Sequence, residues 1–257
     1  MSAIAPSILT MLDVVAAERR ARAGDVALSD KVSAIKRFQQ ARFIHTYADL
    51  LRSPRYGSAA RFFLDELYGP DDFTQRDTQF ARVVPSMVKL FPREVVETVA
   101  DLTRLHALSE TLDTEMARHA TTADLSAMSY LQAWNATDRR ADRELQIELT
   151  LAVAARLDKL TRKALLRNSL RLMRGPARAA GLGELQKFLE AGFDTFRTMN
   201  GAVEFISVVQ VREQTFASCL FAAVRGQTNS DSRALQEALA CLPGETGDLK
   251  STASSRL

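Results

Sequence analysis

Seven cations recur at three- and four-residue spacing in the second half of the chain and offer the clearest prospect of chemistry. On a helix this spacing places them on one side, where like charges repel unless an anion lies near. Clustered Lys and Arg on one face bind phosphate backbones and other anionic surfaces. The pattern therefore predicts a site for an anionic ligand or nucleic acid, formed by Arg156, Lys159, Lys163, Arg167, Arg171, Arg174 and Arg178.

The alternative interpretation of this basic stripe is structural. Neighbouring helices can supply acids, for instance Glu110, Asp113 and Glu115, or water can solvate the face. The charge asymmetry itself is local. Residues 156–178 hold eight Lys or Arg against one acid, Asp158, which gives +7, whereas the whole chain has a net charge of +3.

Two histidine–acid pairs are candidates for a metal site. His106 is followed one helical turn later by Glu110, and His45 is followed in the same way by Asp49. If their helices were neighbours, two imidazoles and two carboxylates would converge inside a bundle and bind a transition metal. This pattern keeps open a metal- or haem-binding bundle, with an oxidase as its activity. The alternative is that each histidine is a hydrogen-bonded core residue.

Two weaker patterns have simpler structural explanations. Residues 177–185 resemble the turn of a helix-turn-helix, but the helix that follows begins with Glu184, whose charge would repel phosphates. We therefore favour a helix corner. An acidic patch comprises Asp65, Glu66, Asp71, Asp72 and Asp77, and helix capping by Asp72 with Gln75 explains most of it.

The elements that must position these residues are all expected to be helical. Apolar residues recur at three- and four-residue spacing throughout, and no segment alternates as a strand does. The predicted fold is an all-α bundle of roughly eight to ten helices. Residues 138–174 contain no Gly or Pro and predict one long central helix, which Gly175–Pro176 ends.

The chain is long enough for one helical domain with a substantial core. We expect this domain to span residues 1–224, with 8–23 as a peripheral N-terminal helix and 225–257 as a mobile C-terminal tail. Within that tail, residues 233–242 could form a brief amphipathic helix. No apolar run is long enough for a transmembrane segment, and two cysteines without a signal sequence favour the cytoplasm.

Three stretches resemble a family of uncharacterised, all-helical bacterial proteins. They are residues 61–70 with Arg76 and Asp77, residues 105–110, and residues 165–196. The similarity spans about residues 31–223. It implies a helical fold and a bacterial setting, and it carries no activity.

The sequence contains no phosphate-binding glycine loop, nucleophile elbow or zinc-protease pair. Whether the protein is an enzyme is therefore left open, and no cofactor is favoured. We expect a soluble helical binding or regulatory module that uses the basic stripe. The alternatives are the metal- or haem-binding bundle and a structural protein whose apolar last helix contributes to a homodimer.

Overall fold

The computed structural model describes residues 4–66, 73–223 and 231–244. All regular secondary structure in these residues is helical, which confirms the predicted fold class. The described part contains thirteen helices, more than the eight to ten expected, and the segment 138–174, predicted as one helix, is divided. They are α1 Ile4–Ala23, α2 Val26–Thr46, α3 Ala48–Arg52, α4 Gly57–Glu66, α5 Thr74–Leu90, α6 Arg93–His119, α7 Ala127–Thr137, α8 Arg140–Thr161, α9 Ala164–Leu172, α10 Arg174–Ala179, α11 Gly183–Thr198, α12 Val203–Ala222 and α13 Asp231–Ala240.

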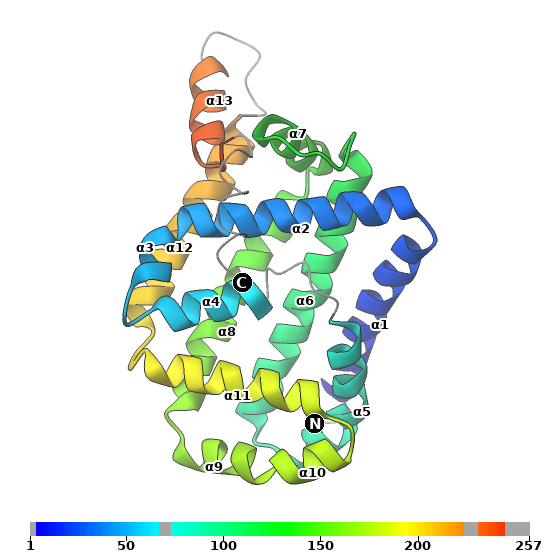
Figure 1. Cartoon of the computed structure of the whole chain (residues 1–257), viewed down its shortest axis with the longest axis vertical. Coiled ribbons are helices and arrows are strands. Elements are labelled where there is room, and N and C mark those ends of the chain that lie inside the picture. The colour runs from blue at the N-terminus through cyan, green and yellow to red at the C-terminus, as the bar shows by residue number, and fades with distance from the viewer. Residues whose placement is uncertain (1–3, 67–72, 224–230, 245–257) are drawn as a thin grey trace, which may run out of the picture.

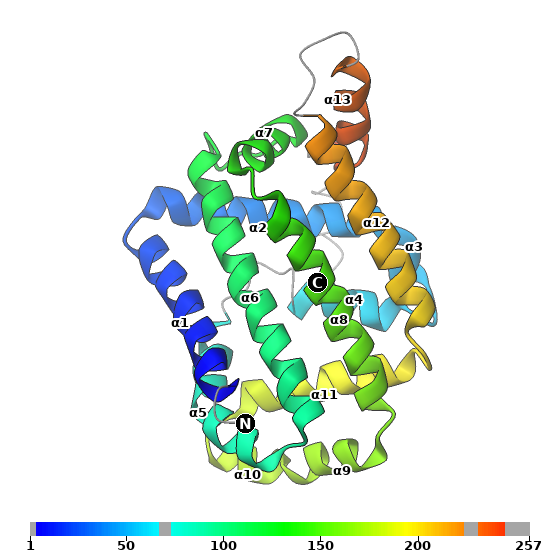
Figure 2. The ribbon, with the colours of Figure 1, turned by 180° about the vertical axis from the view of Figure 1, so that it is seen from behind.

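The helices form two layers. Helices α1, α6, α8 and α12 lie side by side in one layer, and α2, α4 and α11 cross it on the other side (Figures 1 and 2). Helices α7 and α13 lie at one end of the molecule, and α9 and α10 close the opposite end. In the part of the chain that the structure describes, no helix combines the length and the apolar composition that crossing a bilayer requires.

The long central helix is α6, with 27 residues, and not the segment 138–174. That prediction was wrong because α8 ends at Thr161, and Lys163 adopts an extended backbone (φ −83°, ψ 101°) before α9 begins. The cause is tertiary packing. The change of direction lays α9 against α11, where the amide of Gln186 donates a 2.7 Å hydrogen bond to the carbonyl of Leu170. A straight helix would carry the inward-facing leucines of α9 away from the body.

The N-terminal helix α1 is a core element, which corrects the expectation of a peripheral helix. Ile8 and Val15 are almost completely buried, and α1 packs along α6. The sequence shows the apolar periodicity of this segment, but it does not show which residues cover the apolar face. Residues of α5 and α6 cover it in the structure.

At the other end of the chain, the described residues 231–244 contain α13, which packs against α12 and α7. Ala238 and Leu242 belong to the largest hydrophobic cluster, together with residues of α2, α6, α7 and α12. This stretch of the predicted tail is therefore a packed part of the body.

Asp25 caps α2, and this contact gives a first prediction. Its carboxylate accepts a 3.0 Å hydrogen bond from the backbone amide of Leu28. Replacing an N-cap Asp by Ala removes that acceptor and typically costs about 1 kcal/mol. We expect Asp25→Ala to lower the free energy of unfolding by about this amount in chemical denaturation. Asp30→Ala, in the interior of the same helix, should change it by less than about 0.5 kcal/mol.

Candidate ligand-binding cavity

The structure does not form the predicted continuous basic stripe. The change of direction between α8 and α9 separates its two halves, and acids from other helices pair with four of its seven cations. Arg156 contacts Glu97 and Asp101 of α6, the latter at 3.1 Å, and Lys163 contacts Glu94. The N-terminal half of α6 therefore neutralises the first part of the stripe.

Helix α11 neutralises most of the second part. Arg167 lies 3.1 Å from Asp194, and Arg174 lies 2.6 Å from Glu190. Helix α11, which stands where a helix-turn-helix would have its recognition helix, packs against α4, α5 and α8. It is therefore part of the body of the protein, as the helix-corner interpretation expects. Among the described residues, the stripe cations that are exposed without an ion pair are Lys159, Arg171 and Arg178.

The four predicted metal ligands lie in two separate places. Asp49 forms a bidentate pair with Arg212, with two 2.7 Å hydrogen bonds, and His45 is exposed at the end of α2. His106 and Glu110 lie in α6, and cations surround Glu110. No group of three His, Cys, Asp or Glu side chains that could hold a metal occurs in the described residues. The predicted four-residue metal site is not formed, because the two histidine–acid pairs are not brought together, and Arg212 and the cations around Glu110 neutralise the two carboxylates.

Glu110 is instead the centre of a buried ionic cluster where α1, α2 and α6 meet. Its carboxylate accepts a 2.6 Å hydrogen bond from Arg22 of α1 and another of 2.6 Å from Lys36 of α2. The side chains of Arg22 and Glu110 are nearly inaccessible to solvent. Because a buried charge is tolerated only when it is paired, these contacts must persist in the folded protein.

A second carboxylate extends this cluster to α5. Asp77 lies 2.9 Å from Nε2 of His106 and 2.9 Å from Arg19 of α1. Of the predicted acidic patch, Asp77 is thus an internal residue, whereas Asp65 is exposed. Asp71 and Asp72, with the capping box expected from Asp72, lie outside the described residues.

The electrostatics of the cluster differ from one carboxyl group to the next. For Glu110, burial raises the pKa, but the effect of Lys36 and Arg22 is larger and lowers the pKa to about 2. For Asp77, the opposing effects of burial and of His106 and Arg19 also leave the pKa below its ordinary value. For Asp113, burial outweighs Lys36 and the hydrogen bond from Gln39, and the pKa is raised.

These charged groups line part of a cavity of about 140 Å³, which we call the polar cavity after them. The larger part of its wall is apolar and aromatic. The guanidinium of Arg76 stacks between the rings of Phe73 and Phe188, at 4.0 and 4.4 Å from their centroids. The polar groups that reach this cavity are Lys36, Arg76, Asp77, Thr103, His106, Ser109, Glu110, Asp113, Gln146 and Thr150.

An apolar cavity of about 340 Å³ adjoins the polar one. Helices α4, α5, α6, α8, α9, α10 and α11 contribute to it, and its wall is almost entirely aliphatic and aromatic. The two cavities meet at side chains that line both of them, which are Phe63, Phe80, Val99, Leu102, Leu185, Phe188 and Leu189. The arrangement therefore places a cavity with charged groups beside an apolar cavity.

Comparison with known proteins identifies the family. A family model described as a domain of unknown function, DUF8198, matches residues 18–226. The chain belongs to the DUF8198 family. No curated protein and no solved structure matches the chain. The resemblance to an uncharacterised helical family is confirmed, and the matched range of DUF8198 encloses the span of residues 31–223 expected from the sequence.

The DUF8198 region includes both cavities apart from Leu12 of α1. Sequence reasoning singled out His106, Glu110 and Asp77 but not their partners Arg22 and Lys36. The sequence offered one signal for Lys36, because this residue directly follows Ile35 in an apolar helix pattern. The structure shows that Ile35 is fully buried. The apolar cavity has no such signal, because its residues have the composition of an ordinary core.

Proposed function

We propose that this protein binds a small amphipathic molecule, with its apolar tail in the apolar cavity and its polar head in the polar one. The observation that carries the proposal is the position of the 340 Å³ apolar cavity directly beside a compartment lined by buried charges. Small-molecule sites have this composition, which is mostly apolar with a few placed polar groups, and typical volumes of roughly 300–1,000 Å³.

The composition of the apolar cavity favours an apolar occupant. The wall of this cavity is apolar and reaches the surface at Leu90 and Met173, so water that fills it finds few hydrogen bonds. An apolar tail that displaces this water removes apolar surface from solvent, which is favourable by about 25 cal/mol per Å².

The polar cavity can orient a head group because it offers both donors and acceptors. The ammonium of Lys36 and the hydroxyl of Ser109 can donate, and the carboxylates of Asp77 and Glu110 can accept. These side chains are held in place by their own partners. Ser109, for example, accepts a 2.8 Å hydrogen bond from Gln146. A site that is ordered before the ligand arrives loses little entropy on binding.

Equilibrium titration of an environment-sensitive fluorescent fatty acid, dansylaminoundecanoic acid, tests this proposal. We expect saturable binding to the purified protein. Ala177→Phe fills part of the apolar cavity from α10 and should weaken binding at least about tenfold. Ala179→Phe places the same ring on the exposed side of α10 and should leave the affinity unchanged.

Thermal melts of both variants identify any loss of fold. Absence of saturable binding to the native protein, or equal affinity of a folded Ala177→Phe variant, would refute the proposal.

We also propose a bacterial, cytoplasmic setting and a homodimer. Cys219 of α12 and Cys241, which directly follows α13, are both free thiols, which suits a reducing compartment. Val203 and Val211 of α12 are exposed apolar residues that a second copy would cover. Light scattering of the purified protein tests the dimer, and a monomeric mass would exclude it.

A further inference from the structure

The apolar cavity reaches the surface at the end of the molecule closed by α9 and α10. Leu90 and Phe91, where α5 leads into α6, line this cavity and are nevertheless 78% and 36% exposed. Met173, between α9 and α10, also lines it and is 48% exposed. The junction of α5 with α6 and the pair α9–α10 lie at the same end (Figures 1 and 2). This end is therefore the opening of the apolar cavity.

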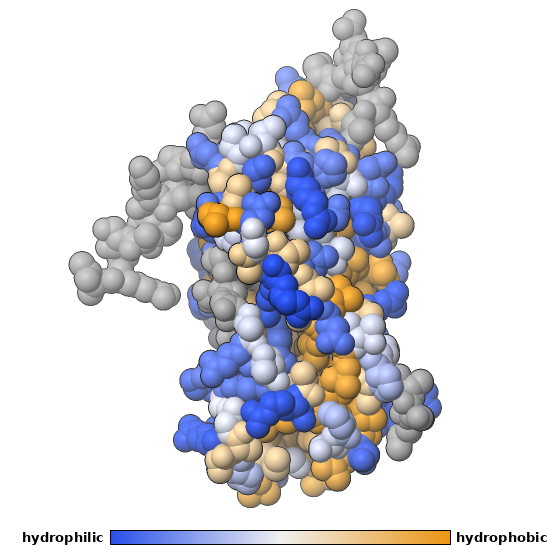
Figure 3. All heavy atoms as spheres, turned by 90° about the vertical axis from the view of Figure 1, so that its right-hand side faces the viewer, coloured by the Kyte–Doolittle hydropathy of each residue, from blue (hydrophilic) through white to orange (hydrophobic). Residues whose placement is uncertain are grey.

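Helix α9 presents apolar residues on two opposite sides. Leu166 and Leu170 face the cavity, whereas Leu165 and Leu172 are 82% and 79% exposed. A separation of seven residues places the two outer leucines on the same side of the helix. Figure 3 views the molecule from the side of α1 and α5 and shows that hydrophobic residues are also exposed over the lower half of that face. Large apolar side chains exposed on the outer side of a helix are candidates for an interaction site.

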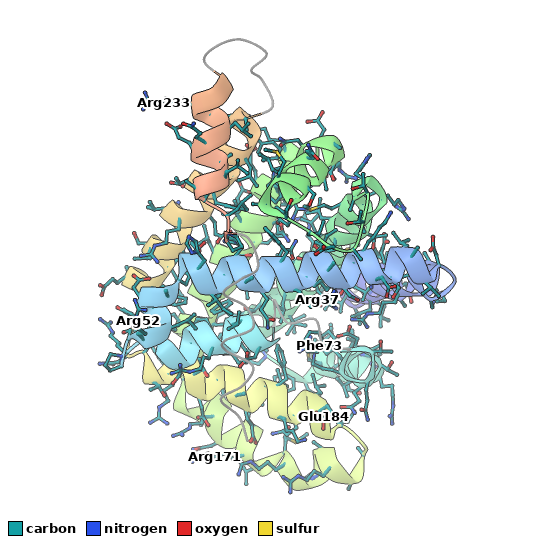
Figure 4. The ribbon with its side chains drawn as sticks, turned by 45° about the horizontal axis from the view of Figure 1, so that its top comes forward. Arg37, Arg52, Phe73, Arg171, Glu184 and Arg233 are labelled. Atoms are coloured by element: carbon teal, nitrogen blue, oxygen red, sulfur yellow. The ribbon has the colours of Figure 1, made fainter. Side chains whose placement is uncertain are left out.

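Exposed positive charge is also present at this end of the molecule. The sequence holds no acidic residue from 159 to 183. Among the described residues, the exposed side chains of Lys89, Arg171 and Arg178 have no ion pair. Figure 4 shows Arg171 on α9 at this end of the molecule. Exposed leucines together with exposed cations, as on α9 and α10, are typical of helices that lie in the interface of an anionic bilayer.

We propose that the α9–α10 end docks on an anionic lipid bilayer, with Leu165 and Leu172 inserted among the acyl chains. The cations Lys89, Arg171 and Arg178 then contact lipid phosphates. Docking places the opening at Leu90 and Met173 against the hydrocarbon layer, so an apolar tail can enter the cavity without crossing water. The docking surface uses residues other than those that fix the head group, and its use for loading rests on the proposed function.

Vesicle co-sedimentation tests the docking surface. We expect the native protein to bind phosphatidylcholine–phosphatidylglycerol vesicles, to bind phosphatidylcholine vesicles weakly, and to dissociate in high salt. The double variant Arg171→Gln, Arg178→Gln should bind the anionic vesicles roughly tenfold or more weakly. The matched control is Arg37→Gln with Arg52→Gln, which removes two exposed arginines from α2 and α3 (Figure 4). This control should bind as the native protein does.

A second pair of variants tests the apolar contact. Leu172→Glu should abolish vesicle binding, whereas Val26→Glu, at an exposed apolar position at the start of α2, should not change it. Equal binding of Leu172→Glu and the native protein, or an equal loss in the arginine control, overturns the proposal. The proposal is also overturned if the native protein binds no vesicles and forms a dimer that the substitution Leu172→Glu dissociates. Titration with the fluorescent fatty acid separates the docking proposal from the ligand-binding proposal, because it measures binding to the cavity in the absence of vesicles.

Discussion

Replacing Glu110 by leucine is expected to lower the free energy of unfolding by about 3–5 kcal/mol at neutral pH. The substitution leaves the guanidinium of Arg22 and the ammonium of Lys36 close together with their main counter-charge removed. Both cations lie within the ionic cluster, and the almost fully buried guanidinium of Arg22 is left without its carboxylate partner, which is costly. Urea denaturation followed by circular dichroism measures the change.

The matched control is Glu97→Ala, which removes an acid from the same helix. Glu97 pairs with Arg93 and Arg156 at the surface, and exposed pairs contribute about 0–1 kcal/mol. Combining Glu110→Leu with Lys36→Met removes one of the two stranded charges and should recover part of the loss. A loss below about 1 kcal/mol in Glu110→Leu would show that water reaches the cluster, which would contradict the ionic arrangement.

Local sequence signals predicted the elements well where a local interaction determines them. The sequence predicts a helix over residues 125–135, and α7 begins one residue after Ser126, whose side chain forms a capping box with Ser129. It also predicts that Pro85 kinks or divides a helix, and the structure excludes the division, because α5 continues through this residue as one helix. The break at Lys163 has no local signal, because no Gly or Pro precedes it and the cause is packing on α11.

The site was less predictable than the fold because its contacts join distant parts of the chain. Arg22 and Glu110 are 88 residues apart, and Asp77 and His106 are 29 apart. The spacing of the basic stripe identified its cations but could not show that the acids of α6 and α11 would reach them. A cavity is harder still, since it depends on how seven helices pack, and its apolar residues resemble any other core.

Acidification is expected to destabilise the protein through Glu110. The pKa of this group is about 2 in the folded chain, below its ordinary 4.5, so the unfolded chain binds the proton more readily. Its contribution is therefore complete above about pH 5 and is lost as the pH falls toward 2. At about 1.4 kcal/mol per pKa unit, the loss is about 3 kcal/mol. The lowered pKa of Asp77 acts in the same direction.

The neighbouring Asp113 acts in the opposite direction, because its raised pKa makes the folded chain take up that proton first. Urea denaturation between pH 7 and pH 3 separates the groups. Glu110→Gln should flatten the profile, and Asp113→Asn should steepen it.

Asp49 is the control, because its pKa is also lowered to about 2, by the hydrogen bond from Arg212. That pair is half-exposed, so Asp49→Asn should alter the profile by about 1 kcal/mol or less. A profile of Glu110→Gln as steep as that of the native protein would show that the buried carboxylate does not determine the acid sensitivity.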